Sequence, residues 1–321
     1  MWSVVQATGR RGRRGSGRPG GSAPAAPSDV TVAGTADGVE VAAPEGSGIY
    51  VDGAFTGEVA PATIALDGTH TVGVGSDDGQ FVEFDADAGD GAATVGAGTV
   101  VSNRPWRVAI IPVRTTIHGP GGPENTGIVT AADVEAITEQ LQATSDEMVE
   151  PYSYGTASWD IEVLPMVTDV ELRRGSGTGE PPDGGALVEE AGLSSVNEDY
   201  DFHVIFYGVL TADGEPVDDE PSCLWGGGNA VALHNVWNVR ERGAEPFEGF
   251  LHEWLHVVEQ RHGADAPEAV STGGLHGAQE IVGEDGEPTS QWLNAYRRFM
   301  RSQVAEGGDF TGVFTTLRDG P

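Results

Sequence analysis

The stretch from Glu245 to Gln260, EPFEGFLHEWLHVVEQ, decides how the second half of this 321-residue chain is expected to fold. Its apolar residues recur at helical spacing and form one continuous stripe, made of Phe247, Phe250, Leu251, Trp254, Leu255 and Val258. Pro246 suits the first turn of a helix, and Gly263 suits its end. The pattern therefore predicts an amphipathic helix that packs one face against a core.

The same helix carries two histidines one turn apart, His252 and His256, with Glu253 directly after the first. At about 100° per residue, His256 lies roughly 40° from His252, so both imidazoles leave one face of the helix. Two neutral imidazoles at this spacing suit two positions of a tetrahedral zinc ion, Zn2+. Glu253 projects about 100° from His252, where its carboxylate can reach a metal-bound water without binding the metal. The motif predicts a zinc ion on His252 and His256, with Glu253 as general base.

Three residues are candidates for the third zinc ligand: His262, His276 and Glu280. His262 completes the spacing of the metzincin pattern HExxHxxGxxH, but Glu259 stands where that pattern has a turn-forming Gly. His276 follows the loop of residues 264–274, which can bring a second segment back across the helix. Glu280 in that segment would instead give a gluzincin-like site. Glu259 shares the ligand face and is expected to orient a ligand imidazole.

The chain around this helix resembles a group of bacterial HExxH proteins described as secreted. The resemblance is carried by HEWLHVVE at 252–259, Leu275–His276, and WLNAYRRFM at 292–300. It implies that His276 is the third ligand, although Gly277 stands where those proteins have Asp. Tyr296, in the last of these stretches, is expected to be a packed helix aromatic; stabilisation of an oxyanion is the alternative.

Residues 31–102 contain short segments in which apolar and polar residues alternate, broken by Gly and Asp. They predict the strands of a small all-β module, at Val39–Val41, Gly48–Val51, Ala62–Leu66, His70–Val74 and Phe81–Phe84. Asp52–Gly53 and Asp67–Gly68 are predicted hairpin turns, because Gly accepts a positive φ.

Several short motifs of this module recur in a known family: Pro44–Ser47, Tyr50–Gly53, Gly57, Pro61 and Gly68–Val72. Through them the module resembles the PEGA domain, a β-module associated with cell surfaces. PEGA modules usually accompany larger extracytoplasmic domains, so the resemblance implies an attachment or spacer role, outside the cell or at its surface. The one histidine of the module, His70, is expected to be an ordinary strand residue.

Residues 103–321 alternate between predicted strands and helices. Strands are predicted at Arg107–Val113, Trp159–Val163, Tyr200–Tyr207 and Asn229–Leu233, the last at a sheet edge. A long helix is predicted to begin after Thr130, with Asp133 completing a capping box, and to run to about Val149. Strand, helix, strand and strand before a zinc-motif helix is the layout of zincin catalytic domains, which this part therefore resembles.

Charge and composition restrict the partners of the protein. The net charge is −33, and all 17 basic residues are arginines. Such a surface repels nucleic acids and anionic membranes, and it is typical of proteins adapted to high salt. No run of about 18 apolar residues predicts a membrane span. Cys223 is the single cysteine, so neither an intramolecular disulfide nor a Cys-based zinc site is expected.

We therefore expect an α+β protein in three parts. Residues 1–30 form a disordered basic, Gly-rich tail, residues 31–102 the PEGA-like β-module, and residues 103–321 a zincin-like catalytic domain with a mixed sheet and an active-site helix. The expected activity is zinc-dependent hydrolysis of protein or peptide substrates, by an endopeptidase rather than an exopeptidase. The alternatives are a non-catalytic surface-binding or adhesion module that retains a structural zinc, and hydrolysis of a non-peptide amide.

Overall fold

The computed structural model describes residues 29–89, 92–119, 122–126, 129–173, 200–207, 231–235, 240, 243–262, 291–306 and 309–321. Five predictions concern residues outside these ranges: the tail before residue 29, Cys223, Gly263 as the end of the zinc-motif helix, His276 and Glu280. Among the helices of the described residues, none is long and apolar enough to cross a membrane. The architecture is α+β, with several sheets and a few helices, as the sequence predicts.

The N-terminal β-module is built from two antiparallel sheets around a core of small aliphatic side chains and Phe84. The smaller sheet has the order β1-β2-β5, with β1 at Thr31–Thr35, β2 at Gly38–Ala42 and β5 at Ala62–Ile64. The larger has the order β4-β3-β6-β7-β8, with β4 at Ala54–Val59, β3 at Gly48–Val51, β6 at Gly68–Ser76, β7 at Gln80–Gly89 and β8 at Ala92–Val95. A short strand, β9 (Thr99–Val100), also pairs with β7. The five predicted strands are present as β2, β3, β5, β6 and β7.

One of the two predicted hairpin turns is confirmed, and the other is wrong. Asp52–Gly53 joins the paired strands β3 and β4, with φ of 52° and 83° at its two residues, as a tight hairpin turn requires. Asp67–Gly68, however, connects β5 to β6, which belong to different sheets. The chain crosses there from one sheet to the other because Ile64 pairs with Val39 of β2, whereas Gly68 pairs with Ala88 of β7.

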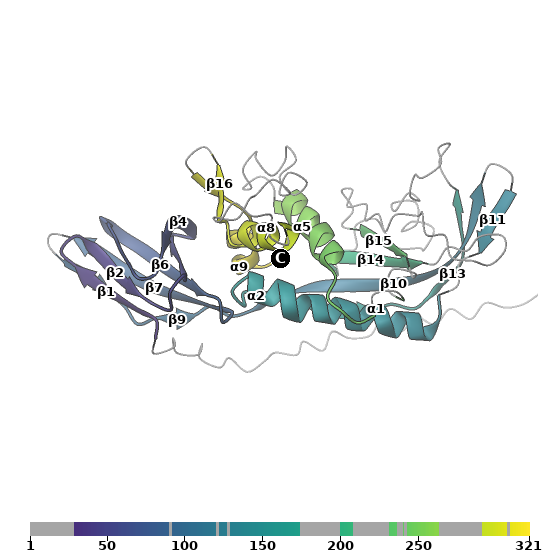
Figure 1. The fold of residues 1–321 in the computed structure, drawn as a ribbon, viewed down its shortest axis with the longest axis horizontal. Coiled ribbons are helices and arrows are strands. Elements are labelled where there is room, and N and C mark those ends of the chain that lie inside the picture. The colour runs from purple at the N-terminus through teal and green to yellow at the C-terminus, as the bar shows by residue number, and fades with distance from the viewer. Residues whose placement is uncertain are drawn as a thin grey trace, which may run out of the picture.

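The second part of the chain is organised around one long strand, β10 (Arg104–Gly119) (Figure 1). Three strands pair with it in parallel: β12 (Ala157–Val163), β13 (Val167–Arg173) and β14 (Phe202–Tyr207). β15 (Val231–Asn235) continues this sheet in parallel beside β14, and β11 (Gly122–Thr126) returns antiparallel to β10. The predicted strand at 107–113 is therefore the buried middle of a longer one. β15 ends the row of described strands on its side, which agrees with the predicted edge strand.

The long helix α1 (Ala131–Thr144) begins as predicted. Thr130 Oγ1 accepts a hydrogen bond from Asp133 N, and the Asp133 carboxylate accepts one from Thr130 N at 2.8 Å, which completes the capping box. Arg240 also donates to this carboxylate. Burial alone would raise the pKa of Asp133, but the hydrogen bonds from Arg240 and Thr130 outweigh burial and hold the pKa below its usual value. The helical path continues through a π-helical turn (Ser145–Val149) to the predicted end at about Val149, and α2 (Glu150–Tyr152) adds three residues beyond it.

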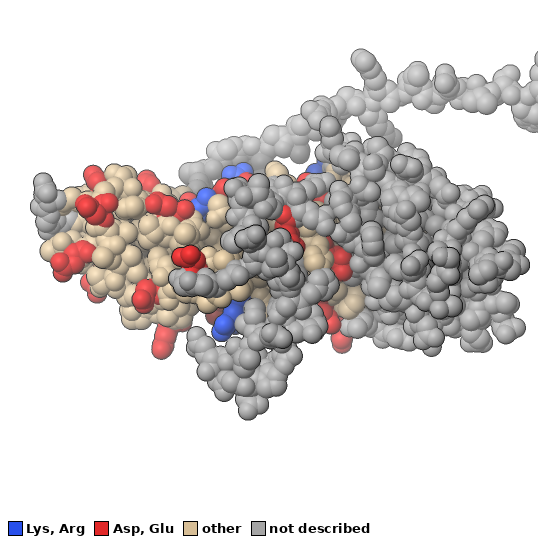
Figure 2. Space-filling model, turned by 90° about the horizontal axis from the view of Figure 1, so that it is seen from above, with Lys and Arg blue, Asp and Glu red and all other residues tan. Residues whose placement is uncertain are grey.

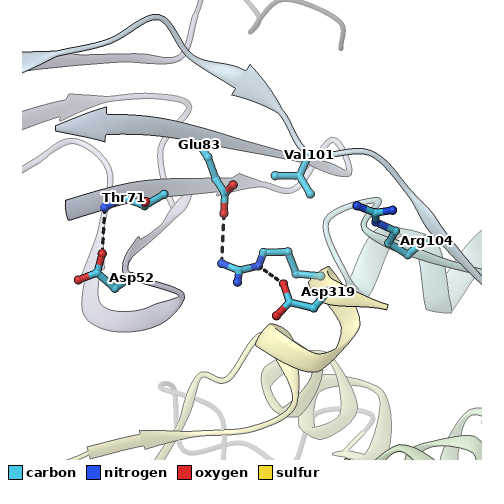
Figure 3. A pocket seen from close by; sticks show the side chains of 7 residues that line it. Asp52, Thr71, Glu83, Val101, Arg104 and Asp319 are labelled. Carbon is cyan, nitrogen blue, oxygen red and sulfur yellow. Dashed lines mark hydrogen bonds and ion pairs between the residues drawn. The ribbon is translucent and has the colours of Figure 1, made fainter. Parts of the chain in front are cut away.

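The β-module packs directly on the second part through a buried aromatic cluster. The cluster contains Tyr50 and Phe81 from the module, Tyr154 after α2, and Phe314 from the C-terminal helix α9 (Phe314–Asp319). Beside it, Arg318 of α9 donates to Glu83 Oε1 of β7 at 3.1 Å, at one wall of an open cleft of about 430 Å³ (Figure 3). The two parts therefore meet at a buried aromatic cluster, distinct from the core of each part.

The acidic surface leads to a prediction about salt. Carboxylates spread over the described face in Figure 2, with few arginines among them. Raising KCl from 0.1 to 1 M shortens the Debye length from about 10 to 3 Å and screens this repulsion. We expect the unfolding midpoint to rise by about 5 °C, roughly 1–2 kcal/mol for domains of this size, as measured by circular dichroism. An unchanged midpoint would contradict a destabilising surface repulsion.

Candidate metal centre

The helix with the zinc motif forms as predicted. Five residues of the apolar stripe lie in α5 (Glu248–His262) and the sixth, Phe247, directly precedes it; all six have exposed fractions of 6 % or less. Trp254 lies at the middle of this face, in edge-to-face contact with Trp106 of β10 and Trp159 of β12. The helix begins two residues later than Pro246, which was predicted in the first turn. Phe247 N instead donates to the buried Thr144 Oγ1 at 2.9 Å, which fixes the entry of α5 against the end of α1.

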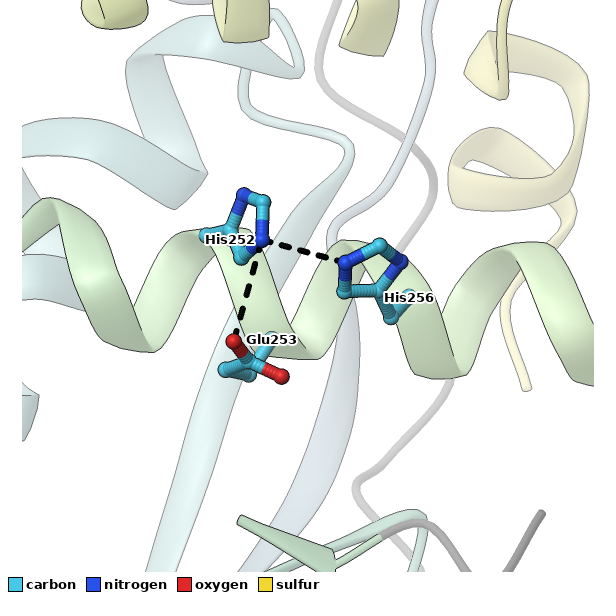
Figure 4. Close-up of side chains that lie close together, drawn as sticks. All are labelled: His252, Glu253 and His256. Carbon is cyan, nitrogen blue, oxygen red and sulfur yellow. Dashed lines mark hydrogen bonds and ion pairs between the residues drawn. The ribbon is translucent and has the colours of Figure 1, made fainter. Parts of the chain in front are cut away.

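The three predicted residues of the motif, His252, Glu253 and His256, lie close together on α5 (Figure 4). The Nε2 atoms of His252 and His256 lie 3.1 Å apart. Glu253 is 6 % exposed, and its Oε1 lies 3.7 Å from His252 Nε2. The ligand atoms of all three residues lie within 4.8 Å of one another, and within the described part of the chain they form the one group of three that could hold a metal ion.

The other ring nitrogen of each histidine has an outer partner. His252 Nδ1 lies 2.8 Å from the hydroxyl of Tyr296, on helix α8 (Gln291–Met300). His256 Nδ1 lies 3.4 Å from Glu259 Oε2, so the predicted contact between Glu259 and a ligand imidazole is present. When Nδ1 donates to such a partner, Nε2 keeps a free lone pair for a metal. With each Nδ1 directed at its outer partner, the two Nε2 atoms point toward the same place.

Tyr296 is suited to this role because it stays protonated. Burial, followed by the negative charges of Glu248 and Glu253, raises its pKa well above the usual value. Its neutral hydroxyl can accept a hydrogen bond from His252 Nδ1–H without adding a charge beside the buried Glu253. The sequence predicts Tyr296 as a packed aromatic, and it is 2 % exposed within the main core. Its bond to His252 is an additional feature that no spacing rule indicates, because the two residues lie on separate helices.

These residues fit a zinc ion. Two ligands at 2.0–2.1 Å from a tetrahedral zinc lie about 3.3–3.4 Å apart, close to the 3.1 Å between the two Nε2 atoms. The donor set, two imidazoles with a carboxylate beside them, is the kind that binds zinc in hydrolytic sites. The side chains of His252 and His256 are 13 % and 18 % exposed, so the ligand face remains reachable from solvent.

The third ligand is restricted by the course of α5. The helix continues unbroken past Glu259 to His262, so the turn that the metzincin pattern requires at position 259 does not form. On a continuous helix, position 262 lies about 9 Å along the axis beyond His256, too far to share its metal. His262 is therefore not supported, and His276 and Glu280 lie outside the described residues.

Two other histidines with described side chains, His203 and His70, lie in strands, as predicted for His70. His203 is 3 % exposed on β14, and its ring packs edge-on against Tyr200. His70 is a strand residue of β6, with its Nδ1 2.7 Å from Asp52 Oδ2. This bond to Asp52 raises the pKa of His70.

Removing the Tyr296 hydroxyl should weaken zinc binding without unfolding the site. Tyr296→Phe keeps the packed ring but leaves His252 Nδ1 without its partner, and loss of such a partner typically costs 10–100-fold in metal affinity. We expect a fall of about 10-fold or more in a competition titration against a chromophoric chelator. Tyr152→Phe is the matched control, because its ring packs on the same core and its hydroxyl makes no hydrogen bond with the described residues. Equal affinities of the two variants would contradict the role of Tyr296.

Comparison with known proteins gives no family assignment: no family model matches the chain, and no curated protein matches its sequence. The resemblances to PEGA modules and to HExxH proteins therefore rest on the sequence motifs alone, and the site must be argued from its own geometry.

Proposed function

We propose that this protein is a zinc-dependent metallopeptidase. One observation carries the proposal: the Nε2 atoms of His252 and His256 converge on one point, with the buried carboxylate of Glu253 beside it. A structural zinc site needs no buried base at this place, whereas hydrolysis requires one. The glutamate is therefore the residue that favours a catalytic site over a structural one.

The roles of the residues follow from their positions. A zinc ion bound here would polarise both a water molecule and the substrate carbonyl. His252 and His256 hold the centre, while Tyr296 and Glu259 fix the orientation of their rings. Glu253 takes a proton from the attacking water and returns it to the leaving amine. Because its side chain is 8 % exposed, few water molecules compete for this carboxylate.

The finer parts of the proposal come from sequence resemblance. We propose a zincin-type catalytic domain, since α5 packs beside a largely parallel sheet, and His276 as the third ligand. We also propose peptide or protein substrates, cleaved internally, and attachment at the cell surface through the PEGA-like module. The acidic surface is consistent with activity in an extracellular medium of high salt concentration.

Zinc removal tests the proposal directly. We expect dialysis against 1,10-phenanthroline to abolish cleavage of a fluorescently labelled casein, and one equivalent of zinc to restore it. Metal analysis of the purified chain should give about one zinc per molecule. Zinc that is bound tightly without any hydrolysis of peptides would contradict the proposal and favour a structural site.

The third ligand is tested by a parallel set of variants. His276→Ala should lower zinc affinity by more than about 100-fold, beyond the loss typical of an outer partner. Glu280→Ala and His262→Ala are the controls and should bind zinc as the wild type does. If Glu280→Ala has the large effect instead, the site is of the gluzincin kind and His276 is not a ligand.

A further inference from the structure

The end of helix α8 is held at the junction with the β-module. Arg301, directly after α8, is 6 % exposed. Its guanidinium donates to the carbonyl oxygens of Pro151 and Tyr152 at 3.0 and 3.2 Å, and its Cζ lies 4.0 Å from the centre of the Tyr154 ring. One residue thereby binds the end of α8 to the segment after α1.

The β-module supplies the other half of this attachment. Asp77, in the turn between β6 and β7, accepts a hydrogen bond from Arg301 Nη1 at 2.6 Å. Tyr50 of β3 is fully buried, and its hydroxyl donates to the Arg301 carbonyl oxygen at 2.7 Å. Gln303 adds a bond from its side chain to the Tyr154 hydroxyl at 3.1 Å. The backbone at the end of α8 is therefore bonded to the module itself.

The same helix carries Tyr296 five residues earlier, about 7.5 Å along its axis and on a different face. That residue holds His252 Nδ1 at 2.8 Å. We propose that the β-module is a structural part of the metal centre. Through its hydrogen bonds with Arg301, the module holds α8 in the position that places Tyr296 against His252. This inference rests on the proposed zinc site, but it assigns the module a role other than attachment.

The distances make this coupling physically reasonable. A hydrogen bond of 2.8 Å is lost when its atoms move apart by about 0.7 Å or more. α8 has ten residues, fewer than the 12–15 or so that an isolated helix needs to be stable. Its placement therefore depends on what it packs against: the core below it, α5 beside it, and the module at its end. Loosening one end is enough to shift the Tyr296 hydroxyl.

The competing explanation is that the core alone places α8. Phe299 and Met300 are 5 % and 0 % exposed within the main core, and they would hold the helix whether or not the module is bonded to it. The two explanations differ in one measurable respect. If the module acts through Tyr296, breaking its contacts with Arg301 should lower zinc affinity only in a chain in which Tyr296 can bond to His252.

The test uses the full chain and two single substitutions on the module side, Tyr50→Phe and Asp77→Asn. Asp77 is 71 % exposed, so its substitution does not endanger folding. We expect each to lower zinc affinity about 3- to 10-fold, less than the loss from Tyr296→Phe. The visible absorption spectrum of the cobalt-substituted protein should shift in the same variants. Arg318→Gln is the matched control, because it breaks an ion pair between the module and α9 without touching α8.

A double-mutant cycle separates positioning from general stability. In the Tyr296→Phe background, Tyr50→Phe should have no further effect on zinc affinity. Additive effects, or a fall in zinc affinity of the same size in Arg318→Gln, would overturn the inference. Unchanged affinity in both module variants would also overturn it, while leaving the proposed peptidase intact. A wild-type chain that binds no zinc would refute the proposed function, and this inference with it.

Discussion

Glu253→Gln is expected to keep zinc bound and to lower kcat/KM for peptide hydrolysis by about 10²–10⁴-fold, the usual contribution of a general base. Gln has the same shape as Glu but cannot take a proton at neutral pH. Its effect on metal binding should be small, because the proposed ligand atoms are the Nε2 atoms of His252 and His256, and Glu253 Oε1 lies 3.7 Å from His252 Nε2. The measurement is steady-state hydrolysis at a zinc content verified for each preparation.

Glu245→Gln provides the matched control for this experiment. It makes the same chemical change at an exposed position three residues before α5. We expect wild-type activity from it. Wild-type activity in Glu253→Gln would exclude Glu253 as the base. Loss of zinc in that variant would instead show that the carboxylate is a ligand.

Trp254→Ala is expected to reduce the free energy of unfolding by about 3–5 kcal/mol, the range for removal of a buried aromatic side chain. Trp254 is fully buried and meets Trp106 and Trp159 edge-to-face, with ring centroids 5.3 and 5.7 Å away. Such pairs add roughly 0.5–1.5 kcal/mol each to the burial of area. Urea denaturation in 1 M KCl measures the effect with surface repulsion largely screened.

Trp254→Phe is the companion variant, since it retains an aromatic ring and should lose less than half as much stability. Trp254 lies about 200° from His252 around the helix, so it faces away from the metal. We therefore expect zinc affinity at low temperature to remain near wild type in the Phe variant. A loss below about 1 kcal/mol in the Ala variant would mean that the core around α5 refills the cavity.

Local signals in the sequence predict local structure well. The apolar stripe and the two histidines predict α5 and the convergence of its ligand face, and the contact of Glu259 with His256 follows from their spacing of three residues. The capping box at Thr130 and the hairpin at Asp52–Gly53 likewise depend on residues close together in the chain. In each case the interacting atoms lie within one turn of helix or one hairpin.

Contacts between distant segments are what the sequence does not predict. The Asp67–Gly68 turn has the composition of a hairpin, but composition does not reveal that β5 and β6 pair in different sheets. The Tyr296 bond spans 44 residues, and the Tyr50 bond to Arg301 spans 251. β10 is longer than its apolar middle, because pairing with β11 and β13 extends it through the polar residues 114–119. Tertiary pairing decides each of these features.

The buried junction has a consequence for how the protein would work at a surface. Only residues 101–103 separate β9 from β10, and Val101 packs against the buried aromatic cluster. A flexible tether lets an enzyme sweep a volume that grows with linker length. The boundary between the module and the second part has no such flexible linker. A partner that binds the module therefore also fixes the orientation of α5. In a molecule anchored through the module, the metal centre would stay at a fixed distance from the surface and in a fixed orientation, and substrates would have to diffuse to it.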